Sequence, residues 1–199
     1  MKLNTIISLL EATDPRAKSV DDLLDLLDSI VDGKFTKDGS KLKVGFDFYC
    51  DNNQLESLKG CPQTVGRDFY CDQNQLKSLE GCPQTVGRNF YCRNNQLESL
   101  KGCPQTVGGG FNCSYNQLTS LSKIDLYIHE IYGEANFMNN PIKSNVLGLL
   151  KIRGLKKVEF DDFKLERIIN KYLPNASTKD IDDCKLELIE AGLEEFAKL

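Results

Sequence analysis

The sequence predicts an α/β-type solenoid, in which tandem repeats form a short curved parallel β-sheet with a helical cap at each end. Three observations support this fold class. A 21-residue unit recurs, its apolar positions recur in register, and the flanking segments have the periodicity of amphipathic helices instead. A fixed period of this length is typical of stacked supersecondary units and not of a single globular core.

The repeats occupy residues 44–124. Three copies are nearly identical and the fourth is looser; they cover residues 44–64, 65–85, 86–106 and 107–124. In the second copy Phe69 and Cys71 are two positions apart, so both point to one face of a short strand. Asn74 follows in a turn, where a buried amide can satisfy backbone groups that strand pairing does not reach. We therefore expect a buried ladder of Asn53, Asn74, Asn95 and Asn116.

The segment Phe69-x-Cys71-x-x-Asn74-x-Leu76-x-x-Leu79 resembles the LxLxxNxLxxL signature of leucine-rich repeats, with Phe and Cys in place of the first two leucines. It is similar to the short type found in secreted bacterial effectors and in small proteins of bacteria and their phages. This resemblance implies a host-directed inhibitor. The Gly-Cys-Pro element at residues 81–83 cannot continue a helix, so the outer side of each repeat should be extended or a short 3₁₀ turn.

Residues 1–43 are predicted to form an N-terminal helical cap with a short hairpin. Ser19 and the apolar residues from Leu23 to Val31 indicate an amphipathic helix that ends at Gly33, and another helix is expected over residues 3–12. An Asp-Gly turn within residues 35–42 predicts the hairpin. A solenoid exposes apolar surface at its end, which this segment would cover.

Residues 125–160 are predicted to form degenerate repeats, and residues 161–199 a C-terminal helical cap. The spacing Phe137-x-x-Asn140-x-Ile142 indicates a fifth repeat, and residues 155–160 indicate a sixth strand. Between them, residues 144–153 favour a helix that ends at Gly154. Two further helices, over residues 162–172 and 178–198, would cover the last strand edge.

Composition argues against several functional classes. A net charge of −4 and a pI of about 5.2 disfavour nucleic acid as a partner, because binding to phosphates needs a basic face. No apolar run is long enough for a membrane span and no signal peptide is recognised, so we expect a cytoplasmic protein, in the host cytoplasm if phage-encoded. The eight cysteines lack metal-site spacing and are interpreted as small buried apolar residues.

Stacked strands place the same repeat position in a column along the sheet. On the face opposite Phe and Cys, the central column is tyrosine and both neighbouring columns are rich in aspartate. Aspartates on adjacent strands repel each other, which a cationic partner would relieve, and tyrosines supply rigid contact area. The predicted partner-binding residues are Asp47, Tyr49, Asp51, Asp68, Tyr70, Asp72, Tyr91 and Arg93.

These features predict a noncatalytic protein-protein interaction module that binds a protein partner on its concave face. Two alternatives stay open: a protein that sequesters a small molecule such as a metabolite or nucleotide, and a structural or assembly component that self-associates through a cap helix. An enzyme is not expected, because the single histidine, His129, has no nucleophile near it in sequence. No catalytic residue, metal or cofactor is predicted.

Overall fold

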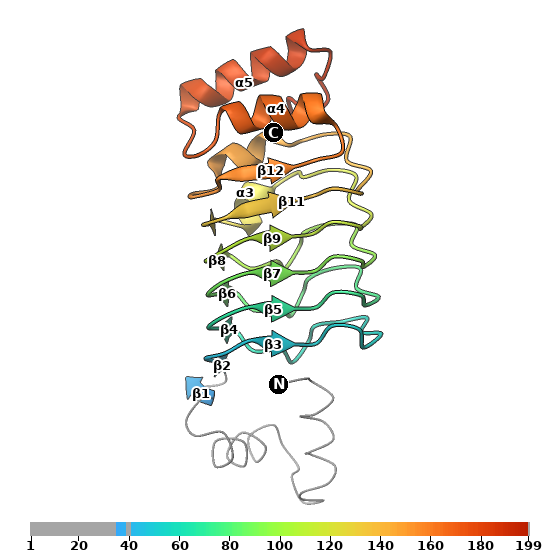
Figure 1. Ribbon diagram of the computed structural model, residues 1–199, viewed down its shortest axis with the longest axis vertical. Coiled ribbons are helices and arrows are strands. Elements are labelled where there is room, and N and C mark those ends of the chain that lie inside the picture. The colour runs from blue at the N-terminus through green and yellow to red at the C-terminus, as the bar shows by residue number, and fades with distance from the viewer. Residues whose placement is uncertain (1–34, 39–40, 199) are drawn as a thin grey trace, which may run out of the picture.

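The computed structural model describes residues 35–38 and 41–198 and shows a parallel β-solenoid (Figure 1). Each full turn of the 21-residue repeat contributes two short strands, and the turns stack into two six-stranded sheets. The predicted repeat solenoid is therefore confirmed.

The first sheet, the Phe-Tyr sheet, contains four strands that begin at the repeat phenylalanines and continues into two strands beyond the fourth repeat. These strands lie one above another in Figure 1: β3 (Phe48–Tyr49), β5 (Phe69–Tyr70), β7 (Phe90–Tyr91), β9 (Phe111–Asn112), β11 (Glu134–Asn136) and β12 (Lys157–Glu159). Pairing is parallel, and Phe69 is the register partner of Phe48 and of Phe90. Because the register equals the repeat period, identical rings stack, with centroids 5.4 Å apart for Phe69 and Phe90.

The second sheet, the Thr-Val sheet, was not predicted; the sequence indicated one sheet, whereas the structure has two. Its strands are β1 (Phe35–Asp38), β2 (Lys41–Val44), β4 (Thr64–Val65), β6 (Thr85–Val86), β8 (Thr106–Val107) and β10 (Glu130–Ile131). The predicted hairpin is confirmed, since β1 and β2 pair antiparallel. The other pairs in this sheet are parallel.

Glycine forms the corner between the two sheets. Val86 is fully buried, and Gly87 follows it at the point where the chain turns towards the Phe-Tyr sheet. A Cβ at Gly87 would lie 2.1 Å from the carbonyl oxygen of Gly66 in the preceding repeat, far inside van der Waals contact. The repeated Val-Gly pair therefore lets successive turns stack closely at this corner.

The predicted buried asparagine ladder is confirmed at Asn74, Asn95 and Asn116, whereas Asn53 is half-buried. Asn95 Oδ1 accepts a hydrogen bond from the Leu76 backbone N–H at 3.1 Å, and its Nδ2 donates to the carbonyls of Cys71 and Cys92. Asn140 makes the corresponding bonds to Leu118, Cys113 and Phe137, so the fifth repeat is also present. The amides satisfy the buried turns that connect the Phe-Tyr sheet to the outer segments.

The chain beyond the fourth repeat keeps both sheets and adds short helices. These elements are α3 (Ile124–Tyr127), the 3₁₀ helix η1 (Leu147–Lys151), α4 (Phe163–Lys171) and α5 (Thr178–Glu190). The predicted sixth strand corresponds to β12, and η1 stands where a helix over 144–153 was expected, with Gly154 after it at φ +78°. In Figure 1, α4 and α5 lie beyond β12.

Helix α4 covers the edge of β12. The Asn170 side chain accepts from the Val158 N–H at 2.8 Å and donates to the Val158 carbonyl at 2.9 Å, so it replaces a neighbouring strand. Helix α5 is shorter than predicted because Gly192, at φ +74°, ends it. The Gly192 and Leu193 N–H groups donate to Ile189 and Leu188, the bonding pattern of a Schellman motif.

The predicted helices over residues 3–12 and 19–33 lie outside the described residues. None of the helices in the described part of the chain is both long and apolar enough to cross a membrane.

Candidate functional site

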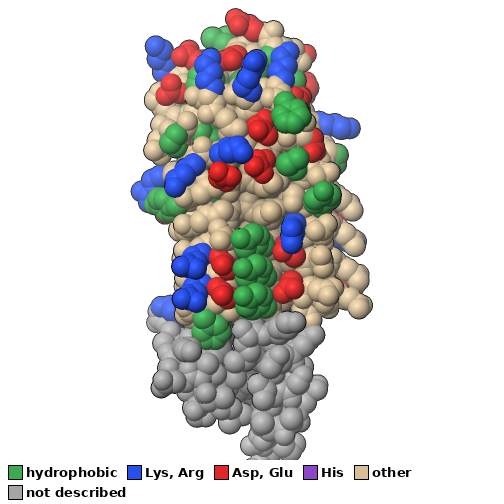
Figure 2. All heavy atoms as spheres, in the orientation of Figure 1, with side chains coloured by type: hydrophobic (Ala, Val, Ile, Leu, Met, Phe, Trp, Pro, Cys, Tyr) green, Lys and Arg blue, Asp and Glu red, His purple; other side chains and the backbone are tan. Residues whose placement is uncertain are grey.

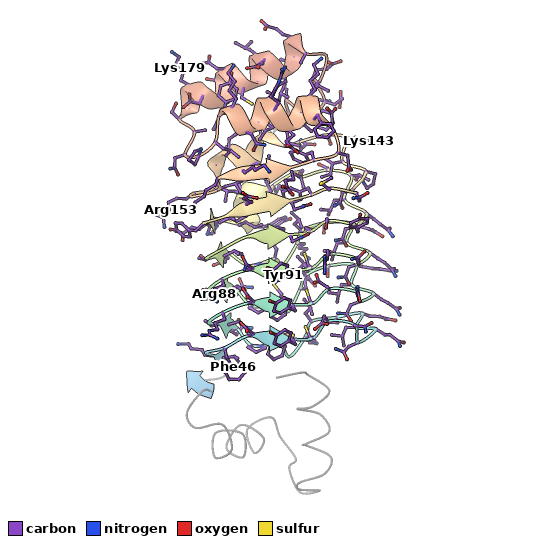
Figure 3. The ribbon with its side chains drawn as sticks, viewed as in Figure 1. Phe46, Arg88, Tyr91, Lys143, Arg153 and Lys179 are labelled. Atoms are coloured by element: carbon purple, nitrogen blue, oxygen red, sulfur yellow. The ribbon has the colours of Figure 1, made fainter. Side chains whose placement is uncertain are left out.

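The outward surface of the Phe-Tyr sheet carries a stack of three tyrosine rings. Tyr49 and Tyr70 have centroids 4.6 Å apart and an interplanar angle of 4°, and Tyr70 and Tyr91 have centroids 4.8 Å apart at 10°. All three side chains are half-buried. Figure 2 shows the stack as a central stripe of apolar colour with acidic side chains on both sides, and Figure 3 labels Tyr91. We call this surface, formed by the eight predicted partner-binding residues, the Tyr/Asp face.

The stacked arrangement determines what each ring can offer a partner. A ring within the stack has neighbours on both of its faces, so Tyr70 presents its edge and hydroxyl group. This geometry disfavours stacking of a planar ligand on Tyr70. It suits a ligand that lies across the row of ring edges and contacts several rings at once.

The column of Asp47 and Asp68 has a structural role that sequence reasoning missed. Asp47 Oδ1 accepts from the Asp68 backbone N–H at 3.1 Å, and Asp68 Oδ1 accepts from the Asn89 N–H at 2.7 Å. Asn89 continues the pattern by accepting from the Gly110 N–H at 2.7 Å. Each side chain therefore bonds the backbone of the next turn, which offsets the repulsion that we predicted between neighbouring carboxylates.

The other oxygens of these two carboxylates face the tyrosine stack. Tyr49 Oη donates to Asp47 Oδ2 at 3.4 Å, and Tyr70 Oη donates to Asp68 Oδ2 at 3.3 Å. These long bonds and the ring stacking hold the rings in a fixed orientation. A preformed contact surface loses less side-chain entropy on binding than a mobile one.

The column on the opposite side of the tyrosines contains Asp51, Asp72 and Arg93. Asp72 is 7% exposed; its Oδ1 accepts from the Arg93 backbone N–H at 2.8 Å, and its Oδ2 lies 3.4 Å from Arg93 Nε. Asp51 is half-buried, and no hydrogen bond or ion pair joins its carboxylate to a residue of the described chain. Asp72 is therefore part of the fold, whereas Asp51 is available to a partner.

The environment raises the pKa of several groups on this face. Burial, followed by the charge of Asp68, raises the pKa of Tyr70 to about 12. Burial also raises the pKa of Asp72, with a smaller contribution from Asp51, although its bonds to Arg93 act in the opposite direction. At neutral pH the Tyr70 hydroxyl is protonated and can donate hydrogen bonds.

The face changes character above Tyr91. Asn112 takes the position of the tyrosine, and its Oδ1 accepts from both the N–H and the hydroxyl of Ser114. The next residue, Tyr115, is 55% exposed and has φ +56°, a left-handed conformation that is uncommon for an aromatic residue. Asn94 occupies the equivalent turn of the preceding repeat.

The cysteines lie in the core as predicted. All eight are free thiols; seven are buried and Cys61 is half-buried. Burial raises the pKa of the Cys71 and Cys82 thiols well above the ordinary value, so these groups are protonated at neutral pH. Within residues 35–38 and 41–198, no group of three or more His, Cys, Asp and Glu side chains is placed to hold a metal ion.

Three of the hollows on the described surface lie outside the Tyr/Asp face. One of about 260 Å³ is lined by Glu56, Gln75, Lys77 and Gln96. The other two, of about 290 and 190 Å³, adjoin the α3 region and share Lys123 in their linings. All three fall below the range of about 300–1,000 Å³ that is usual for small-molecule sites.

Comparison of the chain with protein-family models found no match, and comparisons with curated proteins and with solved structures found none either.

Proposed function

We propose that this protein recognises a protein partner, without catalysing a reaction, through the Tyr/Asp face. The observation that carries the proposal is the row of three parallel, half-buried tyrosine rings on the sheet surface. Tyrosine is enriched at protein interfaces because its ring offers apolar contact and its hydroxyl offers a hydrogen bond. The rings are already ordered by stacking, and four carboxylates surround them.

The shape of the surface favours a protein partner over the alternative of a small molecule. Small ligands usually bind in concave pockets that bury most of their surface. The three hollows described above are small and do not include a residue of the Tyr/Asp face. A row of exposed ring edges provides contact area for another protein but does not enclose a metabolite.

Site-specific photo-crosslinking tests this proposal. A photoreactive phenylalanine analogue replaces Tyr70 in one variant and Thr85, on the Thr-Val sheet, in a matched control; each is irradiated in an extract of the producing cells. We expect a discrete adduct with a protein from the Tyr70 position and none from Thr85, which is exposed on the other sheet.

Competition makes the result specific to the face. Excess wild-type protein should abolish the adduct, whereas a folded variant with Tyr49, Tyr70 and Tyr91 all changed to Ser should not. Far-UV circular dichroism checks that the variant keeps its fold. Equal adducts from both positions, or equal competition by the serine variant, would show that the Tyr/Asp face is not the contact surface.

A further inference from the structure

The Tyr/Asp face contains one internal example of a cation beside its acidic column. Arg93 extends from the turn after β7 to Asp72 on the turn below, where its Nε lies 3.4 Å from Asp72 Oδ2. The Arg93 side chain is half exposed and the Asp72 carboxylate is nearly buried. The fold thus pairs a carboxylate of one turn with a guanidinium of the next.

One turn lower, this pairing is absent. The residue at the position of Arg93 is Asp72, so Asp51 has a like charge above it instead of a guanidinium. On the other side of the tyrosines, Asp47 and Asp68 bond backbone N–H groups and tyrosine hydroxyls, but no ion pair links them to a cation in the described chain. Of the four carboxylates around Tyr49 and Tyr70, only Asp72 therefore forms an ion pair with a cation of the described chain.

We propose that the partner contributes a single basic side chain, arginine or lysine, whose cation binds beside Asp51 at the level of Tyr49 and Tyr70. This inference rests on the proposed function and deepens it by assigning the chemistry of the partner. A cation at this position would extend the Asp72–Arg93 arrangement by one turn and relieve the repulsion between Asp51 and Asp72.

The surroundings restrict how much positive charge the partner can carry. Arg67 and Arg88 are exposed, and in sequence they directly precede the column residues Asp68 and Asn89. Figure 3 labels Arg88 at the edge of the face. Arg93 lies on the other side. A polybasic segment would meet these like charges, so the complementary partner has one basic residue with neutral or acidic neighbours.

A displayed library of random short peptides provides the test. Peptides are selected on the immobilised wild-type chain, and those that also bind the folded variant with serine at positions 49, 70 and 91 are removed. We expect the remaining peptides to share one Arg or Lys. A synthetic representative should bind Asp51→Asn about 10-fold more weakly than the wild type, and its affinity should fall with added salt.

Glu56→Gln is the matched control, because it also removes one carboxylate but lies in an exposed column outside the face. It should leave the affinity unchanged. The Asp51 carboxylate makes no bond within the described chain and is repelled by Asp72, so Asp51→Asn should not melt below the wild type.

The outcomes separate the two proposals. If no peptide survives removal with the serine variant, the Tyr/Asp face is not a protein-binding surface and the proposed function fails, together with the inference. If face-dependent peptides survive but lack a basic residue, are polybasic, or bind Asp51→Asn as tightly as the wild type, the proposed function stands and the cation assignment is wrong.

Discussion

Replacing Asn95 by alanine tests the view that the asparagine ladder stabilises the solenoid. The Asn95 side chain accepts from the Leu76 N–H and donates to the carbonyls of Cys71, Cys92 and Arg93. Alanine leaves a buried N–H without a partner, at a cost of roughly 1–3 kcal/mol, and each lost carbonyl bond adds roughly 0.5–1 kcal/mol. We expect Asn95→Ala to lower the free energy of unfolding by about 3–5 kcal/mol.

Urea denaturation followed by circular dichroism measures this loss, and hydrogen exchange at the Leu76 amide reports the local effect. Gln96→Ala is the control, because the half-buried Gln96 side chain makes no hydrogen bond within the described chain; it should change stability by less than about 0.5 kcal/mol. A loss for Asn95→Ala below about 1 kcal/mol, or no faster exchange at Leu76, would refute the reasoning.

Three further predictions concern the corner, the acidic column and the tyrosines. Gly87→Ala, whose Cβ would lie 2.1 Å from the Gly66 carbonyl oxygen, should lower the free energy of unfolding by about 3 kcal/mol. Gly60→Ala, at φ +97° but with open space around the Cβ, should lower it by about 1–2 kcal/mol. Equal losses for the two variants in urea denaturation would contradict the close approach at Gly87. Because the pKa of Asp72 is raised in the folded state, the protein is most stable with this carboxyl protonated, and stability falls as pH rises from about 4 through the folded pKa. We therefore expect Asp72→Asn to melt no lower than the wild type at pH 7 and to depend less on pH in the acid range. A lower melting temperature at pH 7 would show that the Asp72 charge is net stabilising. Alkaline absorbance titration should detect a tyrosine ionisation step near pH 12 that is missing in Tyr70→Phe. The stability contribution of neutral Tyr70 should be lost as pH rises from 10 to 12. An unchanged titration curve in this variant would rule out the assignment of the step to Tyr70.

Sequence reasoning succeeded where every repeat has the same requirement. Phe90, Cys92 and Asn95 recur in register, and the phenylalanine and cysteine of these two positions are buried in all four repeats. A glycine after a helical pattern also predicted the end of the helical segment at Gly154. The same signal was overlooked at Gly192, where α5 ends earlier than the apolar pattern suggested.

Prediction was less complete where function depends on contacts between turns. The sequence aligned Asp47 with Asp68 and indicated repulsion, but it did not show that each carboxylate bonds a backbone N–H of the next turn. It also did not distinguish Asp72, held by Arg93, from Asp51 in the same column. This difference affects the choice of test variants, because Asp51 can be changed without removing a bond within the described chain.

The stacked repeat, its buried columns and the residues that line one face can be inferred from the sequence, because period and alternation follow from strand geometry. Three features are visible only in the folded chain: the Thr-Val pairs form a second sheet, the tyrosine rings stack with their edges outward, and the Asp51 carboxylate makes no bond to the described residues. These features depend on the distance and direction between atoms of residues that lie 21 positions apart in sequence, on successive turns. A repeat pattern specifies which residues are aligned, but it does not specify which of them form hydrogen bonds.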